Sequence, residues 1–136
     1  MDIDQARAFL RENHHAVLHT YRRDGAPQLS PIAVAVDDEG YATVSSRETA
    51  VKVKNLLRDS RAALCVLNDA FFGEWVFVEG RCEVVHLPDA MEMLVAYYRS
   101  ISGEHPDWAD YRAAMERDQR VMLRISFDRI GPTVSG

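Results

Sequence analysis

The only two lysines of the chain, Lys52 and Lys54, stand close together in a sequence that carries its other positive side chains on arginine. Ser45 and Ser46 precede them, and the residues between predict the start of a helix. Hydroxyl donors, free N–H groups at a helix start and a nearby cation are the groups that bind phosphate. Segment 45–55 therefore indicates an anion site, although serines that only cap a helix and solvated lysines would give the same sequence.

A second candidate stretch lies in a predicted strand over residues 27–36, where Gln28, Ser30 and Ile32 share one face. Pro31 has no N–H to donate to a neighbouring strand, so we expect an edge or an interruption there. Backbone groups freed in this way can meet the polar edge of a ligand. The alternative is an edge strand whose polar residues are simply solvated.

Trp75 and Phe77 project from one face of a long predicted strand. Aromatic rings offer a large contact area to a flat conjugated ligand or to a partner chain. Of these two roles, the interface with a second subunit is the one we favour.

Other catalytic and metal-binding patterns are missing from the sequence. The five histidines are dispersed without metal-ligand spacing, and Ser30 lies in no Gly-x-Ser-x-Gly context. Cys65 and Cys82 stand in apolar runs outside any Cys-x-x-Cys motif, so we interpret them as reduced packing residues. We expect no metal site and no Ser/His/Asp or Cys/His catalytic arrangement.

The elements that must position these residues follow from hydrophobic periodicity and turn residues. Helices are predicted over residues 2–13, from Ser45 or Ser46 to about residue 59, and over residues 88–101 and 107–116. Strands are predicted over residues 14–22, 27–36, 41–45, 62–67, 75–86 and 120–127. An Asp-Gly turn at residues 24–25 predicts a hairpin, and Gly80 predicts a bulge. Hairpins without βαβ alternation favour a mainly β fold, an antiparallel barrel of six strands whose ends are covered by helices.

The whole chain has the size and charge of one ordinary domain. Its 136 residues predict a single domain over 1–136, and its net charge of −5 disfavours binding to nucleic acid. The acidic N-terminus is unlike a signal peptide, and no uncharged stretch approaches the roughly 20 residues that span a bilayer. We expect a cytoplasmic protein that does not bind membranes.

The chain contains, in this order, the stretches AVLHTYRRDGAPQLSPI, SSRETAVKVKNLLRDSRAAL, EWVFVEGRCEVV and YRSISGEHPDWADYRAAMERDQRVMLRI. Together they resemble the pyridoxamine 5′-phosphate oxidase-like split-barrel superfamily. The first three are similar to its first hairpin, to its third strand with the phosphate-side helix and fourth strand, and to its long strand with a Glu-Gly step. The last resembles a subgroup of the actinobacterial branch, which uses the deazaflavin coenzyme F420.

This resemblance implies a split β-barrel and a homodimer with two equivalent cofactor sites at the subunit interface. It also implies a hydride passed between the cofactor ring and a small organic substrate. Lys52 is then the residue expected to contact the cofactor phosphate, with Lys54 or Arg47 assisting. The implied cofactor-binding residues are Gln28, Ser30, Pro31, Ile32, Ser45, Ser46, Lys52, Lys54 and Trp75.

The sequence departs from the subgroup at Ala50, where a basic residue often precedes the lysine by two positions. Coenzyme F420 is the cofactor we expect, and FMN is the alternative within the same fold. A barrel that binds a small molecule or a partner protein without redox activity is the third hypothesis. Because the cofactor supplies the hydride chemistry, no side chain is predicted to be a strict acid–base catalyst. Trp75 is expected to contact both the partner subunit and the shared site.

Overall fold

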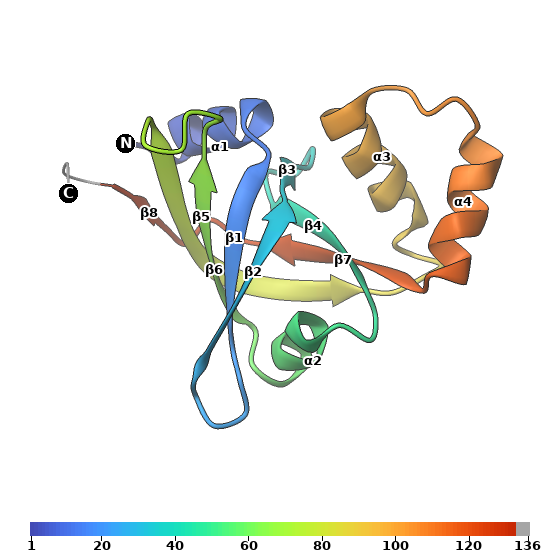
Figure 1. The fold of residues 1–136 in the computed structure, drawn as a ribbon, viewed down its shortest axis with the longest axis horizontal. Coiled ribbons are helices and arrows are strands. Elements are labelled where there is room, and N and C mark those ends of the chain that lie inside the picture. The colour runs from blue at the N-terminus through green and yellow to red at the C-terminus, as the bar shows by residue number, and fades with distance from the viewer. Residues whose placement is uncertain (133–136) are drawn as a thin grey trace.

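The computed structural model describes residues 1–132, in which one curled antiparallel sheet is covered by helices (Figure 1). The helices are α1 (Ile3–Glu12), α2 (Val51–Arg58), α3 (Met91–Ser102) and α4 (Trp108–Arg117). The strands are β1 (His15–Tyr21), β2 (Pro27–Ala33), β3 (Ala35–Val36), β4 (Ala42–Arg47), β5 (Arg61–Leu67), β6 (Trp75–Val85), β7 (Arg120–Ile125) and β8 (Arg129–Gly131). Their order in the sheet is β2-β1-β5-β6-β7-β4-β3, and β8 pairs with β6.

Strand β6 joins the two halves of this sheet. It has 11 residues, of which the first part pairs with β5 on one side and with β8 on the other. Its last four residues pair with β7 instead. The sheet therefore divides along β6 into two curled halves. This is the antiparallel barrel that the hairpins predict, in the split form that the family resemblance implies.

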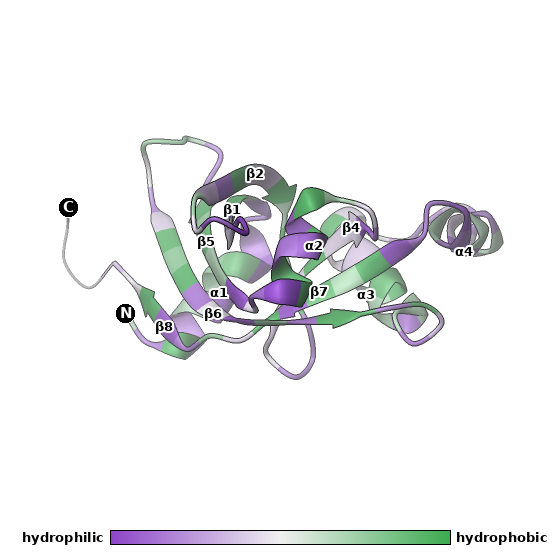
Figure 2. Ribbon diagram, turned by 90° about the horizontal axis from the view of Figure 1, so that it is seen from below, coloured by the Kyte–Doolittle hydropathy of each residue, from purple (hydrophilic) through white to green (hydrophobic). Residues whose placement is uncertain are grey.

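The core fills the interior of the barrel. Side chains alternate between the inside and the outside along each strand, so that Leu18 and Thr20 of β1 are fully buried. Helix α1 covers one end of the barrel, and α2 covers the other end (Figure 1). The view from below shows α2 lying across that end (Figure 2). The buried side chains of the two helices join the same core: Ala6, Leu10, Val53 and Leu56.

Helices α3 and α4 pack outside the barrel, on the side of β4 and β7 (Figure 1). A second, smaller hydrophobic cluster lies there, formed by Ala90, Leu94, Val95, Tyr111 and Met122. Within residues 1–132, none of the helices has both the length and the hydropathy that crossing a bilayer requires.

Several local predictions are confirmed. Gly25 has φ +87° in the turn between β1 and β2, as the Asp-Gly hairpin requires. Helix α1 lies within the predicted residues 2–13, and Asp2 begins it by accepting the N–H of Gln5 at 2.8 Å. Pro31 lies in an edge strand, because β2 ends the strand order and Pro31 faces Val17 of β1.

The prediction that Ser45 or Ser46 caps the following helix is wrong. Both serines pair with β7 inside β4, and the N–H of Glu48 still donates to the carbonyl of Gln119. The ladder therefore keeps the chain extended past the serines. Helix α2 begins only at Val51, after Ala50, whose side chain makes no capping hydrogen bond.

The predicted bulge at Gly80 is also wrong. Strand β6 passes through Gly80 in unbroken register with β5. The extra residue of the bulge lies instead in the segment opposite β6, between the end of β7 at Ile125 and the start of β8 at Arg129. There the backbone oxygen of Ser126 approaches so closely that a Cβ at position 80 would lie 1.8 Å from it.

Other differences concern the bounds of elements. The described residues form eight strands rather than the six predicted, because two short strands were missed. Val34, whose N–H donates to the carbonyl of His14, separates β3 from β2. Strand β8 follows β7, which ends at Ile125 rather than at residue 127. Helix α3 begins at Met91, three residues after Pro88.

Candidate functional site

A groove opens between the end of β2, the end of β4 and the start of α2, with a volume of about 310 Å³. It brings together five of the nine residues that the sequence predicts to bind a cofactor: Pro31, Ile32, Ser45, Ser46 and Lys52. Arg47, which was expected to assist, lines it as well. Residues far apart in the chain therefore meet at one surface, as the anion-site hypothesis requires.

The groove is strongly cationic. Arg47, Lys52 and Arg120 line it, and no described residue with a carboxylate does. The first turn of α2 also contains no acidic residue, so its partial positive charge is unopposed there. In a chain with net charge −5, such a concentration of cations marks a place that attracts anions. We call these residues and the two serines the cationic groove.

Two of these cations are held opposite each other by the sheet. Arg47 of β4 faces Arg120 of β7 in the antiparallel ladder. Like charges directly opposite one another on neighbouring strands destabilise a sheet. An anion bound between them would remove that repulsion, because it attracts both.

Arg120 was not identified from the sequence. Its Nε atom is buried and has no hydrogen-bond partner within residues 1–132. A buried donor without a partner is costly, and a ligand oxygen would satisfy it. Only the pairing of β7 with β4 brings this arginine to the groove that Lys52 lines, so spacing along the chain gave no signal for it.

Helix α2, which carries Lys52, is fixed to the sheet by a buried polar chain. Asn55 donates to the hydroxyl of Thr20 at 3.1 Å, and that hydroxyl donates to Gln28 at 3.1 Å. Arg58 donates to the carbonyl of Tyr21 at 2.7 Å. Since Thr20 and Asn55 are both almost fully buried, these bonds hold the helix start at a defined position beside the groove.

Tyr97 of α3 fixes the mouth of the groove. Its hydroxyl donates to the carbonyl of Ala33 at 2.8 Å and accepts a hydrogen bond from the backbone of Ser45. Burial raises the pKa of Tyr97, opposed by the Ser45 hydrogen bond and by the charge of Arg120. The hydroxyl therefore stays protonated at neutral pH and links the end of β2 to β4.

Four of the predicted residues lie outside the groove. Gln28 is engaged in the polar chain to α2, and the Ser30 hydroxyl oxygen is buried without a partner in the described part of the chain. Lys54 is exposed and does not line the groove. Trp75 lies at the start of β6, in a separate hollow beside Phe9 of α1, on the other side of the barrel from α2 (Figure 1).

Residues 3–133 match the family described as pyridoxamine 5′-phosphate oxidase. The chain is 27% identical over 128 residues to an F420H(2)-dependent biliverdin reductase of Mycobacterium tuberculosis, covering 93% of this chain and 85% of the relative. Its fold is similar to that of a conserved hypothetical protein from Mycobacterium tuberculosis, with TM-score 0.79, 23% identity and coverage of 100% and 93% of the two chains. A structure named F420 reductase gives TM-score 0.71 at 19% identity, with 92% and 94% covered.

The family match spans every element from α1 to β8, and the solved structures share the split barrel. We conclude that the chain belongs to the pyridoxamine 5′-phosphate oxidase family, a family of oxidoreductases.

Proposed function

We propose that this chain is an F420-dependent oxidoreductase, which passes a hydride between the deazaflavin and a small organic substrate. The observation that carries the proposal is the cationic groove, where Arg47, Lys52 and Arg120 meet with no carboxylate among the described lining residues. The relative named as an F420H(2)-dependent biliverdin reductase supports the choice of cofactor.

The groove fits the phosphate of such a cofactor. Lys52 and Arg120 supply charge-assisted donors, and the Ser45 hydroxyl and the start of α2 add further polar groups. The buried Ser46 hydroxyl already donates to the carbonyl of Arg47 at 3.1 Å. Pro31 and Ile32 continue the groove along the edge strand, where the flat ring would rest. The bound cofactor supplies the hydride chemistry, and the protein residues bind and orient it.

We further propose that the molecule works as a homodimer. Val17, Cys65 and Phe77 lie directly opposite one another on β1, β5 and β6, and each is flanked by core residues. They therefore form an apolar row on the outside of the barrel. The row continues to Pro31 of β2, which also lines the cationic groove. A second copy seated on this outer row would lie against the groove and complete the site.

FMN is the second candidate cofactor, because its phosphate presents the same charge to the groove. The decisive measurement is equilibrium titration of the purified protein with F420, with FMN and with riboflavin, which lacks the phosphate. We expect F420 to bind in the micromolar range or tighter. Tight FMN binding without F420 binding would replace the proposed cofactor by FMN. No affinity for either would favour a barrel without redox activity.

Lys52→Ala tests the groove itself. We expect the variant to lose about 1 to 3 kcal/mol of binding free energy for F420 or FMN while remaining folded, because one charge-assisted contact is removed. Riboflavin binding should not change. Lys54→Ala is the matched control, since Lys54 is exposed outside the groove. Equal losses in both variants would reject Lys52 as the phosphate ligand.

A further inference from the structure

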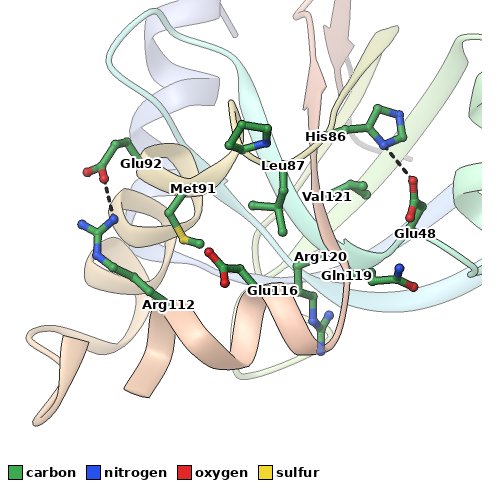
Figure 3. A pocket seen from close by; sticks show the side chains of 11 residues that line it. Glu48, His86, Leu87, Met91, Glu92, Arg112, Glu116, Gln119, Arg120 and Val121 are labelled. Atoms are coloured by element: carbon green, nitrogen blue, oxygen red, sulfur yellow. Dashed lines mark hydrogen bonds and ion pairs between the residues drawn. The ribbon is translucent and has the colours of Figure 1, made fainter. Parts of the chain in front are cut away.

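A larger cavity lies next to the cationic groove, with a volume of about 650 Å³. Figure 3 shows its walls, which come from α3, α4, the start of β7, the segment after β6 and the segment after β4. Small-molecule sites in proteins commonly have volumes of roughly 300 to 1,000 Å³. The cavity is therefore large enough to hold a ligand of its own.

The middle of the cavity is apolar. Leu87 and Met91 lie between the charged side chains at its two sides (Figure 3), and both are half-buried. Burying apolar surface stabilises a complex by about 25 cal/mol of free energy for each Å² removed from water. A ligand with an apolar body is therefore favoured here over one that is polar throughout.

The charged groups on the two sides are already paired. Arg112 donates to Glu92 at 2.6 Å on one side, and His86 Nδ1 lies 3.1 Å from Glu48 Oε1 on the other (Figure 3). The Arg112–Glu92 ion pair presents little net charge to a third group. His86 offsets the charge of Glu48 only when its imidazole is protonated, and water screens that carboxylate because both side chains are 44% exposed.

The two remaining charged lining residues are Arg120 and Glu116, and no ion pair is found for either within residues 1–132. Glu116 is exposed, so water and salt screen its charge. Arg120 has a buried Nε without a partner, so its donor is both less screened and unsatisfied. For an anionic group on a ligand, the attraction to Arg120 is therefore stronger than the repulsion from Glu116.

Arg120 lines the cavity and the cationic groove together. A guanidinium has five N–H donors along more than one edge, so it can serve two anions at once. We propose that this cavity binds a small organic carboxylate, with its carboxylate on Arg120 and its apolar body on Leu87 and Met91. This second site goes beyond the proposed cofactor site, because its occupation requires no redox reaction.

Fluorescence titration with pyrenebutyric acid tests the site, and pyrenebutanol serves as the neutral probe with the same apolar body. We expect saturable binding of the acid and at least about tenfold weaker binding of the alcohol, because the alcohol lacks the charge-assisted contact. Arg120→Gln should abolish this preference. Equal affinities of the wild-type protein for the two probes would overturn the proposal.

Met91→Trp fills the cavity and should weaken acid binding about tenfold or more by excluding the probe. Ala113→Trp adds the same side chain on the exposed surface of α4, away from the cavity lining, and should leave the affinity within about twofold. Glu116→Gln should tighten binding of the acid relative to the alcohol, because it removes a repelling carboxylate. Unchanged binding in Met91→Trp would show that the probe sits elsewhere.

The same titrations separate this site from the groove. Lys52→Ala should weaken FMN binding but leave the affinity for pyrenebutyric acid within about twofold, since Lys52 does not line the cavity. If neither F420 nor FMN binds, the proposed cofactor site fails and the pyrene titrations still decide the cavity. Loss of acid binding in Lys52→Ala would mean that the probe occupies the groove, and would reject the second site.

Discussion

Gly80 faces the segment between β7 and β8, and its lack of a side chain permits a very close approach of the two backbones. A Cβ there would lie 1.8 Å from the Ser126 backbone oxygen, which cannot move without shifting the chain that joins the two strands. We expect Gly80→Ala to lower the free energy of unfolding by more than about 3 kcal/mol, because overpacking against backbone has no side-chain relief.

Gly25→Ala is the matched comparison for Gly80→Ala. Gly25 has φ +87°, yet nothing lies within 4 Å of a Cβ placed there. In Gly25→Ala the only cost is the strain of an alanine in the left-handed conformation, which should lower the free energy of unfolding by about 1 kcal/mol. Urea unfolding of both variants measures the difference. Equal effects would mean that close approach to Ser126 does not constrain the sheet.

At the same scale, the sequence identified Lys52, Ser45 and Ser46 because they are close along the chain and carry the right donors. It did not identify Arg120, whose cationic partners in the groove, Arg47 and Lys52, precede it by 73 and 68 positions in the chain. Residue type and spacing can predict a local cluster. They cannot supply a partner that only strand register brings near.

At the scale of elements, Tyr97 and Tyr111 attach the outer helices by the same kind of bond. Tyr97 donates to the carbonyl of Ala33 at 2.8 Å, and Tyr111 donates to that of Leu94 at 2.8 Å. Only the first bond reaches the mouth of the cationic groove. Tyr97→Phe and Tyr111→Phe should each cost about 1 kcal/mol of unfolding free energy. Only Tyr97→Phe should also weaken FMN or F420 binding, by about fivefold, as titration would measure.

The pH dependence of stability follows from the same tyrosines. Burial raises the pKa of Tyr111 from its ordinary value of 10.0 to about 12, with a smaller contribution from Tyr97. Between these values the unfolded chain releases a proton that the folded chain retains, so stability falls as the pH rises through this window. Tyr111→Phe should reduce that fall, as urea unfolding at about pH 8 and about pH 11 would measure. An unchanged alkaline loss would assign it to other groups.

The elements themselves were predictable where local signals agree with tertiary pairing. The hairpin at Gly25 and the capped α1 are such cases, because turn and capping residues act within a few positions. The helix start near Ser45 was not, because pairing of β4 with β7 extends the strand past two good capping residues. Long-range ladders override local preference at element ends.

At the scale of the whole molecule, the succession of hairpins predicted an antiparallel barrel, and the family resemblance implied its split form. The outer apolar row of Val17, Cys65 and Phe77 needed the register of three strands, which no periodicity along one strand reveals. Its position beside the groove supports the proposed two-chain site, since one surface would both bury apolar area and border the cations.

The proposed homodimer makes the last prediction. Phe77→Asp places a charge in the middle of the outer row, where a partner chain would bury it without a counter-ion, so the variant should be monomeric in light-scattering measurements. Phe72→Asp is the control, because Phe72 is 92% exposed in a loop outside the row and its variant should remain dimeric. The monomeric variant should also bind F420 or FMN more weakly if the partner completes the site. A dimer that persists in Phe77→Asp would place the interface on another face, and a monomeric wild-type protein would leave the cationic groove to bind its ligand within one chain.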